Sequence, residues 1–210
     1  MEPFSAKERA AIANAITRAE STTSGEIVVV VASASGRYYG IALMWAALAA
    51  LTVPLPLIWL TNWPVEHIYL AQLAVFIIGA ALTQWEDLRF AIVPKSIKRA
   101  RAHQKAVEQF LAQSLHTTKG RTGVMIYVSF AEHYAEVIAD EGIYRKVPQS
   151  TWNEVVDTLT AHLARGARVE GFVTAIETCG KILAEHFPPG SMDHDELPNH
   201  LIVIDGRWSA

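Results

Sequence analysis

The sequence predicts an α/β protein: a small central mixed β-sheet flanked by helices, with a two-helix transmembrane hairpin inserted after the first strand. Three observations carry this prediction. A β-branched run, "EIVVVVA" (26–32), is typical of a strand buried on both faces of a sheet. Two long uncharged apolar runs follow it directly, and a second β-rich run, "TGVMIYVSF" (122–130), comes after them. The sequence of one globular domain is therefore interrupted by a membrane-spanning insertion.

The composition agrees with one domain plus an insertion in a chain of 210 residues. Hydrophobic residues make up 51% and charged residues 19%, and the apolar excess is concentrated between Ile41 and Trp85. The net charge of −3 gives no global field that would favour nucleic acid. The single cysteine, Cys179, suits a reducing compartment.

Residues 1–38 are predicted to form the N-terminal part of the domain. Ser5 and Glu8 have the spacing of a capping box, and Ile12 and Ile16 then repeat on one helical face. We expect this helix to precede the strand at 26–32.

Residues 41–85 are predicted to form the transmembrane hairpin, with spans at 41–60 and 68–85. Each run lacks charged residues over about 18 to 20 positions, near the length needed to cross a bilayer, and Pro54 and Pro56 predict a kink in the first. The turn at 61–67 contains no lysine or arginine, whereas both flanks contain several. The positive-inside rule then places both ends of the chain in the cytoplasm and only the turn outside. A buried helical hairpin in a soluble core is the alternative.

Residues 86–187 are predicted to complete the domain. The pattern predicts a long amphipathic helix from about Pro94 to His116, its face marked by Ile97, Ala100, Gln104, Val107, Phe110, Leu111 and Leu115. Strands at 122–130 and 134–140 follow with a short connection that favours an antiparallel hairpin. Two helices come next, the first capped by Ser150 and the second with the stripe Phe172, Ile176, Cys179, Leu183 and Phe187. Residues 188–210 are predicted to be a C-terminal tail.

This order of elements resembles the TPM domain family. The match is carried by "TSGEIVVVVA", by "TGVMIYVSFAEHYAEVIADEGI" and by the two helices after it. The chain is most similar to short bacterial members with an internal membrane hairpin, which implies the cytoplasmic (inner) membrane. The family also includes thylakoid proteins linked to photosystem II upkeep and a thylakoid acid phosphatase.

The acidic positions differ from the common family pattern. Where many members have Asp-Asn-Gly-Val, this chain has Arg121, Thr122, Gly123 and Val124, and a common Gly-x-Gly-Leu is replaced by Asp140, Glu141, Gly142 and Ile143. The acidic surface that binds calcium in some relatives is therefore not copied residue for residue.

Three acidic residues are the candidate metal ligands: Asp140, Glu141 and Glu132. Asp140 and Glu141, beside Gly142, predict a weak site for calcium or magnesium, since these cations take oxygen ligands. Glu132 lies at the opposite end of the predicted hairpin, about 20 Å away at the rise of a strand, so it is not expected to share the ion. Solvated turn carboxylates are the alternative. "DHDE" (193–196) is a further metal candidate, for which a solvated tail is the alternative.

A basic run follows the second span and predicts contact with the membrane surface. Each basic side chain near anionic headgroups contributes roughly 1 kcal/mol. The same residues also serve as a topology signal, and they lack the aromatic neighbours that stack on nucleic-acid bases. They are Lys95, Lys98, Arg99, Arg101 and Lys105.

Two functions compete. The first is a non-catalytic interaction module that helps to assemble or maintain membrane-protein complexes, with the lipid bilayer and another membrane protein as partners. The second is a membrane-bound, metal-dependent acid phosphatase, which rests on the resemblance. Cys179 is predicted to be a buried structural thiol, because it lies on an apolar helical stripe and no arginine completes a cysteine-phosphatase loop. The sequence leaves the catalytic residues unknown.

Overall fold

The computed structural model describes residues 4–117, 120–189 and 200–204. It divides into two compact units, residues 1–35 together with 100–210, and residues 36–99. The first unit holds the sheet, and the second holds the apolar helices.

The sheet is mixed and has four strands in the order β3-β2-β1-β4. Strand β1 (Glu26–Ala32) pairs in parallel with β2 (Gly123–Ser129) and with β4 (Leu201–Ile204). Strand β3 (Tyr134–Ala139) forms an antiparallel hairpin with β2. Every residue of β1 and β2 is buried, as expected for the two central strands. The α/β prediction and the antiparallel hairpin are thereby confirmed.

Strand β4 was not predicted from the sequence. It is only four residues long and follows a segment rich in proline and acidic residues, so no local periodicity reveals it. Its partner β1 lies far away in the chain. The two strands pair in parallel, with Val29 of β1 beside Leu201 of β4. The metal candidate at 193–196 lies outside the described residues.

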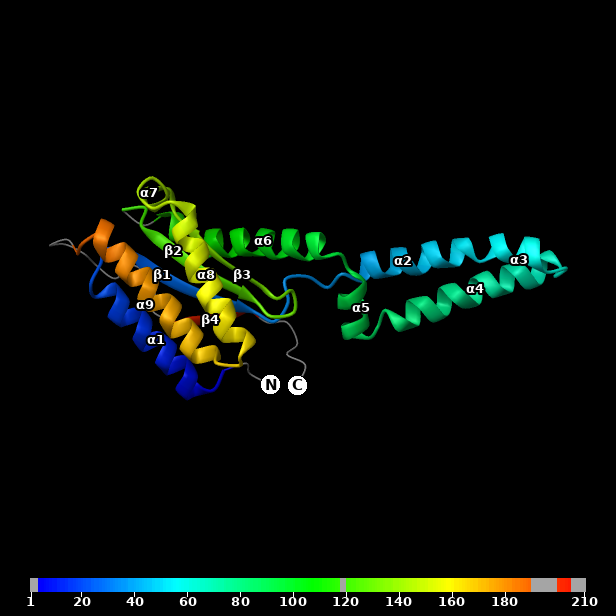
Figure 1. Ribbon diagram of the computed structural model, residues 1–210, viewed down its shortest axis with the longest axis horizontal. Helices are drawn as coiled ribbons and strands as arrows, with labels where there is room; N and C mark the ends of the chain where they lie inside the picture. The colour runs from blue at the N-terminus through cyan, green and yellow to red at the C-terminus, as the bar shows by residue number, and fades with distance from the viewer. Residues whose placement is uncertain (1–3, 118–119, 190–199, 205–210) are drawn as a thin grey trace. The chain divides into compact units, whose positions relative to one another are not determined.

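Helices α1 (Ala6–Glu20), α8 (Gln149–Ala164) and α9 (Arg168–His186) cover one face of the sheet (Figure 1). The main core lies between these helices and alternate residues of the strands, among them Ile27, Val29 and Ile126. The capping box of Ser5 and Glu8 is present at the start of α1. The expectation that Ser150 caps α8 is wrong: the helix begins at Gln149, with Pro148 at the cap position.

Helix α6 (Lys95–Ala112) packs on the opposite face and is followed by a 3₁₀ turn, η1 (Leu115–Thr117). The helix forms as predicted, but the predicted face is wrong in part. It buries Ala102, Ala106 and Phe110 against the sheet, whereas Ala100, Gln104, Val107 and Leu111 are exposed. The sheet carries the large side chains Met125 and Tyr127 on this face, so a helix with small residues can approach closely.

The second unit contains an apolar helical hairpin. Helices α2 (Tyr39–Thr52) and α3 (Pro54–Leu60) are separated at Val53, next to the first predicted kink proline, and α4 (Val65–Leu82) returns beside α2. Two stretches, Tyr39–Leu60 and Val65–Leu82, are long and apolar enough to cross a membrane. Their packing uses small residues, since a Cβ added at Gly79 would lie 3.0 Å from the Cβ of Ala46.

A short helix, α5 (Glu86–Ile92), follows the hairpin and was not predicted. Its Arg89 is buried, donates to the Thr83 carbonyl oxygen over 3.2 Å, and lies 4.0 Å above the ring of Tyr39. Because Tyr39 begins α2 and Thr83 directly follows α4, this one side chain ties the two ends of the hairpin together.

Candidate functional site

The polar residues of the domain gather on the α6 side of the sheet, in two cross-strand rows. Tyr127 of β2 lies opposite Glu136 of β3, and Ser129 lies opposite Tyr134. The next row toward the start of β2 is apolar, with Met125 opposite Ile138. Since side chains alternate between the faces of a strand, these four polar residues share one face. They lie where the parallel strands β1 and β2 end, an edge at which α/β sheets commonly bind ligands.

A partly buried hydrogen-bond network extends one end of these rows. The Tyr127 hydroxyl lies 2.9 Å from the Ser35 Oγ, which donates to Ser129 Oγ over 2.9 Å. Ser129 Oγ in turn donates to Glu132, whose two oxygens also accept the Ser35 backbone N–H at 3.0 Å. We call Ser35, Tyr127, Ser129 and Glu132 the strand-end network. Burial raises the pKa of Tyr127, so its hydroxyl stays protonated at neutral pH.

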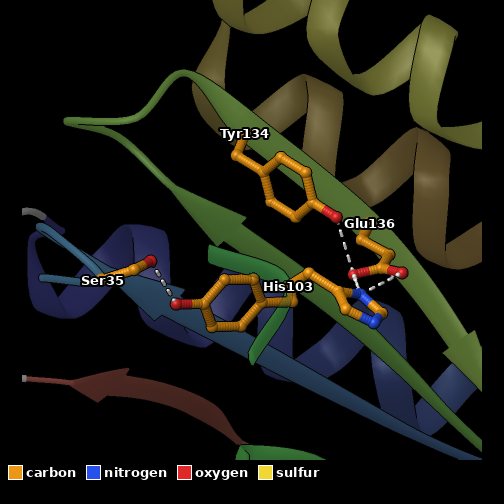
Figure 2. Close-up of polar contacts among 5 residues, drawn as sticks. Ser35, His103, Tyr134 and Glu136 are labelled. Atoms are coloured by element: carbon orange, nitrogen blue, oxygen red, sulfur yellow. Dashed lines mark hydrogen bonds and ion pairs between the residues drawn. The ribbon is translucent and has the colours of Figure 1, made fainter. Parts of the chain in front are cut away.

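A second group joins α6 to strand β3. His103 Nδ1 lies 2.9 Å from a carboxylate oxygen of Glu136, and the Tyr134 hydroxyl donates to the same oxygen over 2.9 Å. Figure 2 shows the Glu136 carboxylate between the imidazole and the phenol, with Ser35 at the other side of the view. The carboxylate fixes the orientation of the ring, and the His103 side chain is 57% exposed. An imidazole held this way is suited to proton transfer or to a single bond with a ligand.

The predicted metal ligands are separated by the fold. Glu132 lies at the turn of the hairpin, next to the Ser129–Tyr134 pair, whereas Asp140 follows Ala139 at the other end. The structure uses Glu132 inside the strand-end network. Among the residues described, no three His, Cys, Asp or Glu side chains come together in a group that could hold a metal ion.

Asp140 and Glu141 begin a short helix, α7 (Glu141–Tyr144), that was not predicted. Asp140 Oδ1 accepts the Glu141 N–H at 2.7 Å, while Oδ2 is buried and has no hydrogen-bond partner among the described residues. A Cβ on Gly142 would lie 2.6 Å from the Arg121 carbonyl oxygen, so only glycine fits there. Asp140 Oδ2 is thus one carboxylate oxygen left over for a cation.

Glu141 is occupied by two arginines. It lies 2.5 Å from Arg145 and 3.6 Å from Arg121, and the hydrogen bond from Arg145 holds the pKa of Glu141 below its usual range. A divalent ion would have to displace these guanidinium groups to use Glu141. Of the two predicted ligands, Asp140 therefore has an oxygen available for a cation, whereas Glu141 is already paired with arginine.

The basic residues after the second span are only partly available. Lys98 donates to the Phe90 carbonyl oxygen over 3.1 Å, and Lys105 pairs with Glu108 at 3.1 Å. Lys95, Arg99 and Arg101 are exposed.

The two polar rows were not predicted from the sequence. Their signal is the spacing of Tyr127 and Ser129 on one strand and of Tyr134 and Glu136 on the next, each two residues apart. Such a pattern places polar groups on one face, but the pairing register that brings the rows together comes only from the hairpin. His103 joins them from a distant segment, so nothing local predicts its role.

Comparison with known proteins agrees with this architecture. The family model described as "TPM domain" matches residues 81–182. Residues 81–182 therefore resemble a TPM domain. The matched part of the chain includes α6, the β2–β3 hairpin and most of α9.

A solved structure shares the fold of this chain. The NMR structure of the BA42 protein from the psychrophilic bacterium Bizionia argentinensis aligns with a TM-score of 0.62 and 23% sequence identity, covering 96% of each chain. At this identity the likeness concerns the fold alone. No curated protein matches the chain.

Proposed function

We propose that this chain is a membrane-anchored TPM-domain module that acts without catalysis in assembling or maintaining membrane-protein complexes. The observation that carries the proposal is the apolar hairpin: its large side chains face outward, with Trp59 86%, Leu60 81% and Val65 78% exposed. A core helix of a soluble protein buries such residues, whereas a bilayer solvates them.

The proposed orientation puts the domain and both chain ends in the cytoplasm. The turn at 61–67 has no lysine or arginine, while Arg89, Lys95, Lys98 and Arg99 follow the second span. Trp59, Trp63 and Tyr69 at the turn match the aromatic belt of a membrane interface. The exposed Lys95 and Arg99 would then rest on anionic headgroups, at about 1 kcal/mol each.

The non-catalytic role is supported by how the acidic residues are used. Glu132 accepts hydrogen bonds that fix the end of β1, and Glu141 pairs with Arg121 and Arg145. Both carboxylates thus have structural duties inside the domain. These contacts make the domain rigid, and a rigid domain held at the membrane suits an interaction module.

The alternative is a metal-dependent acid phosphatase. It is favoured by one observation: among the described residues, the buried Oδ2 of Asp140 has no hydrogen-bond partner. A divalent cation there would supply the charge that phosphoryl transfer requires.

Phosphatase assays on the full chain in detergent separate the two functions. The protein would be incubated with a chromogenic phosphomonoester at acid and neutral pH, with calcium, magnesium, manganese and zinc in turn. We expect the wild type and Asp140→Asn to give equal, background rates. Metal-stimulated turnover that disappears in Asp140→Asn would overturn the non-catalytic proposal.

A further inference from the structure

Helix α6 has a second apolar face that the sheet leaves uncovered. Its inner face is buried through Ala102, Ala106 and Phe110. On the outer side, the side chains of Ala100, Gln104, Val107 and Leu111 are all exposed, and Leu111 is 53% exposed. We call these four residues the α6 outer stripe.

The spacing of the outer stripe is that of a coiled coil. Its members follow one another at steps of four, three and four residues, which keeps them on one seam of a helix. Ala100 and Val107 take one of the two core positions of the heptad, and Gln104 and Leu111 take the other. A single polar residue in such a seam is a known device for fixing register.

Two opposite charges flank the seam on the same side. Arg101 and Glu108 directly follow Ala100 and Val107, so both occupy the same flanking heptad position. Glu108 is already oriented toward the seam, since Gln104 Nε2 donates to it over 3.3 Å and Lys105 lies 3.1 Å from it. In an antiparallel pair of coiled-coil helices, this flanking position of one helix faces the same position of the other.

We propose that the α6 outer stripe pairs in antiparallel fashion with the same stripe of a second copy of this chain. Setting Gln104 against Val107 of the second copy also sets Leu111 against Ala100. The same register brings Arg101 of each copy opposite Glu108 of the other. The interface is isologous, as the two-fold symmetry of a homodimer requires.

A second copy fits the stripe better than a lipid surface does. Glu108 already pairs with Lys105 of its own chain, and Arg101 of a second copy adds a further opposite charge, which anionic headgroups cannot supply. The seam spans only two heptads, too short for strong pairing of free domains. Two chains confined to one bilayer have a raised effective concentration, which makes a weak interface sufficient.

Cysteine cross-linking in membranes tests the pairing. Native Cys179 is buried and does not interfere. Two tagged full-length versions, Gln104→Cys and Val107→Cys, would be co-expressed and oxidised. We expect a disulfide between the two tags, and none when Val107→Cys is replaced by Glu154→Cys, an exposed control on α8. Equal cross-linking of the control, or no cross-link at either position, would overturn the proposal.

Charge exchange tests the register and the direction. Arg101→Glu and Glu108→Arg each place two like-charge contacts in the dimer, so each should lower the cross-linked fraction about tenfold. The double variant restores both contacts and should recover the wild-type yield. Helical content measured by circular dichroism checks that each variant folds. A Glu108→Arg variant that binds anionic vesicles more tightly while cross-linking is unchanged would point to lipid as the occupant.

Discussion

Glu132 shows how one side chain decides the local structure of the domain. It lies in the β2–β3 turn, yet both of its oxygens accept the backbone N–H of Ser35, which follows β1. The carboxylate therefore holds the segment through which the chain leaves the sheet toward residues 36–99.

Replacing Glu132 by Gln should destabilise the domain. The amide keeps the shape but loses the charge that strengthens hydrogen bonds from Ser35 and Ser129, so we expect a loss of about 1.5–3 kcal/mol in unfolding free energy. Urea unfolding of the full chain in detergent, followed by circular dichroism, measures it. The control Glu154→Gln changes an exposed carboxylate on α8 and should alter stability by less than about 0.5 kcal/mol.

Cys179 is expected to be inert in the folded protein. It is fully buried in the main core, and burial raises the pKa of its thiol to about 12. In the unfolded chain the pKa of this thiol is 9.0, so the thiol is neutral in both states below that pH and costs the native state nothing. As pH rises from 9 toward 12, only the unfolded chain ionises the thiol, and the free energy of unfolding falls. A thiol reagent at pH 8 should label the protein only after denaturant is added. Rapid labelling of the native chain would contradict the burial of this residue.

The calcium hypothesis is also decided at single residues. With Glu141 paired to two arginines, we expect calcium to bind in the millimolar range, the weak end for such sites. Arg145→Ala should tighten binding, because it frees one carboxylate oxygen. Isothermal titration calorimetry or NMR titration of the full chain with calcium measures the affinity. The Asp140→Asn variant should no longer bind calcium. No response at several millimolar in either the wild type or Arg145→Ala would leave these residues as turn carboxylates.

Helix pairs meet most tightly where small residues allow it. Helices α1 and α9 cross at Gly180, where an added Cβ would lie 2.7 Å from the Cβ of Ala19. A methyl group at that distance forces the two helices apart, and the core between them with Ile16 and Ile176 must follow.

Gly180→Ala should therefore destabilise the domain although alanine is the better helix former. Overpacking costs about 1–3 kcal/mol, which exceeds the gain of about 1 kcal/mol in helix propensity. Thermal unfolding of the full chain compares this variant with Gly40→Ala, whose added Cβ meets nothing within 4 Å. If both substitutions stabilise the protein, the close α1–α9 contact is wrong.

The whole chain combines a sheet domain and an apolar hairpin that interrupts it between β1 and β2. The parallel pairing of these strands needs a long crossover connection, and the chain uses this connection to carry the hairpin and α6. An insertion there leaves the sheet register untouched.

We expect the hairpin to be oriented with its turn outside the cytoplasm and both ends of the chain inside. A reporter active only outside the cytoplasm should work when inserted within Thr61–His67 and fail when fused after Ala210. The reason is the lysine and arginine count, which is zero in the turn and positive on both flanks. A reporter active only in the cytoplasm serves as the matched control, and a reversed pattern would refute the proposed topology.

The sequence alone determined the parts whose signals are local. The β-branched run predicts β1, the uncharged runs predict the apolar hairpin, and 3.6-residue periodicity predicts α1, α6, α8 and α9. Motif order was enough to indicate the TPM family. Cys179 lies on the predicted stripe and is buried as expected.

Tertiary structure decided what depends on distant segments. Strand β4 pairs with β1, and Asp140 caps a short helix whose Gly142 lies close to the Arg121 carbonyl. Two faces of α6 carry apolar residues, so the sequence does not indicate which of them packs on the sheet. In the structure Ala102 and Ala106 face the sheet and Val107 is exposed. The polar rows with His103 likewise arise from strand register and from packing between elements. These contacts join residues far apart in the chain, and their energies have no counterpart in a local pattern.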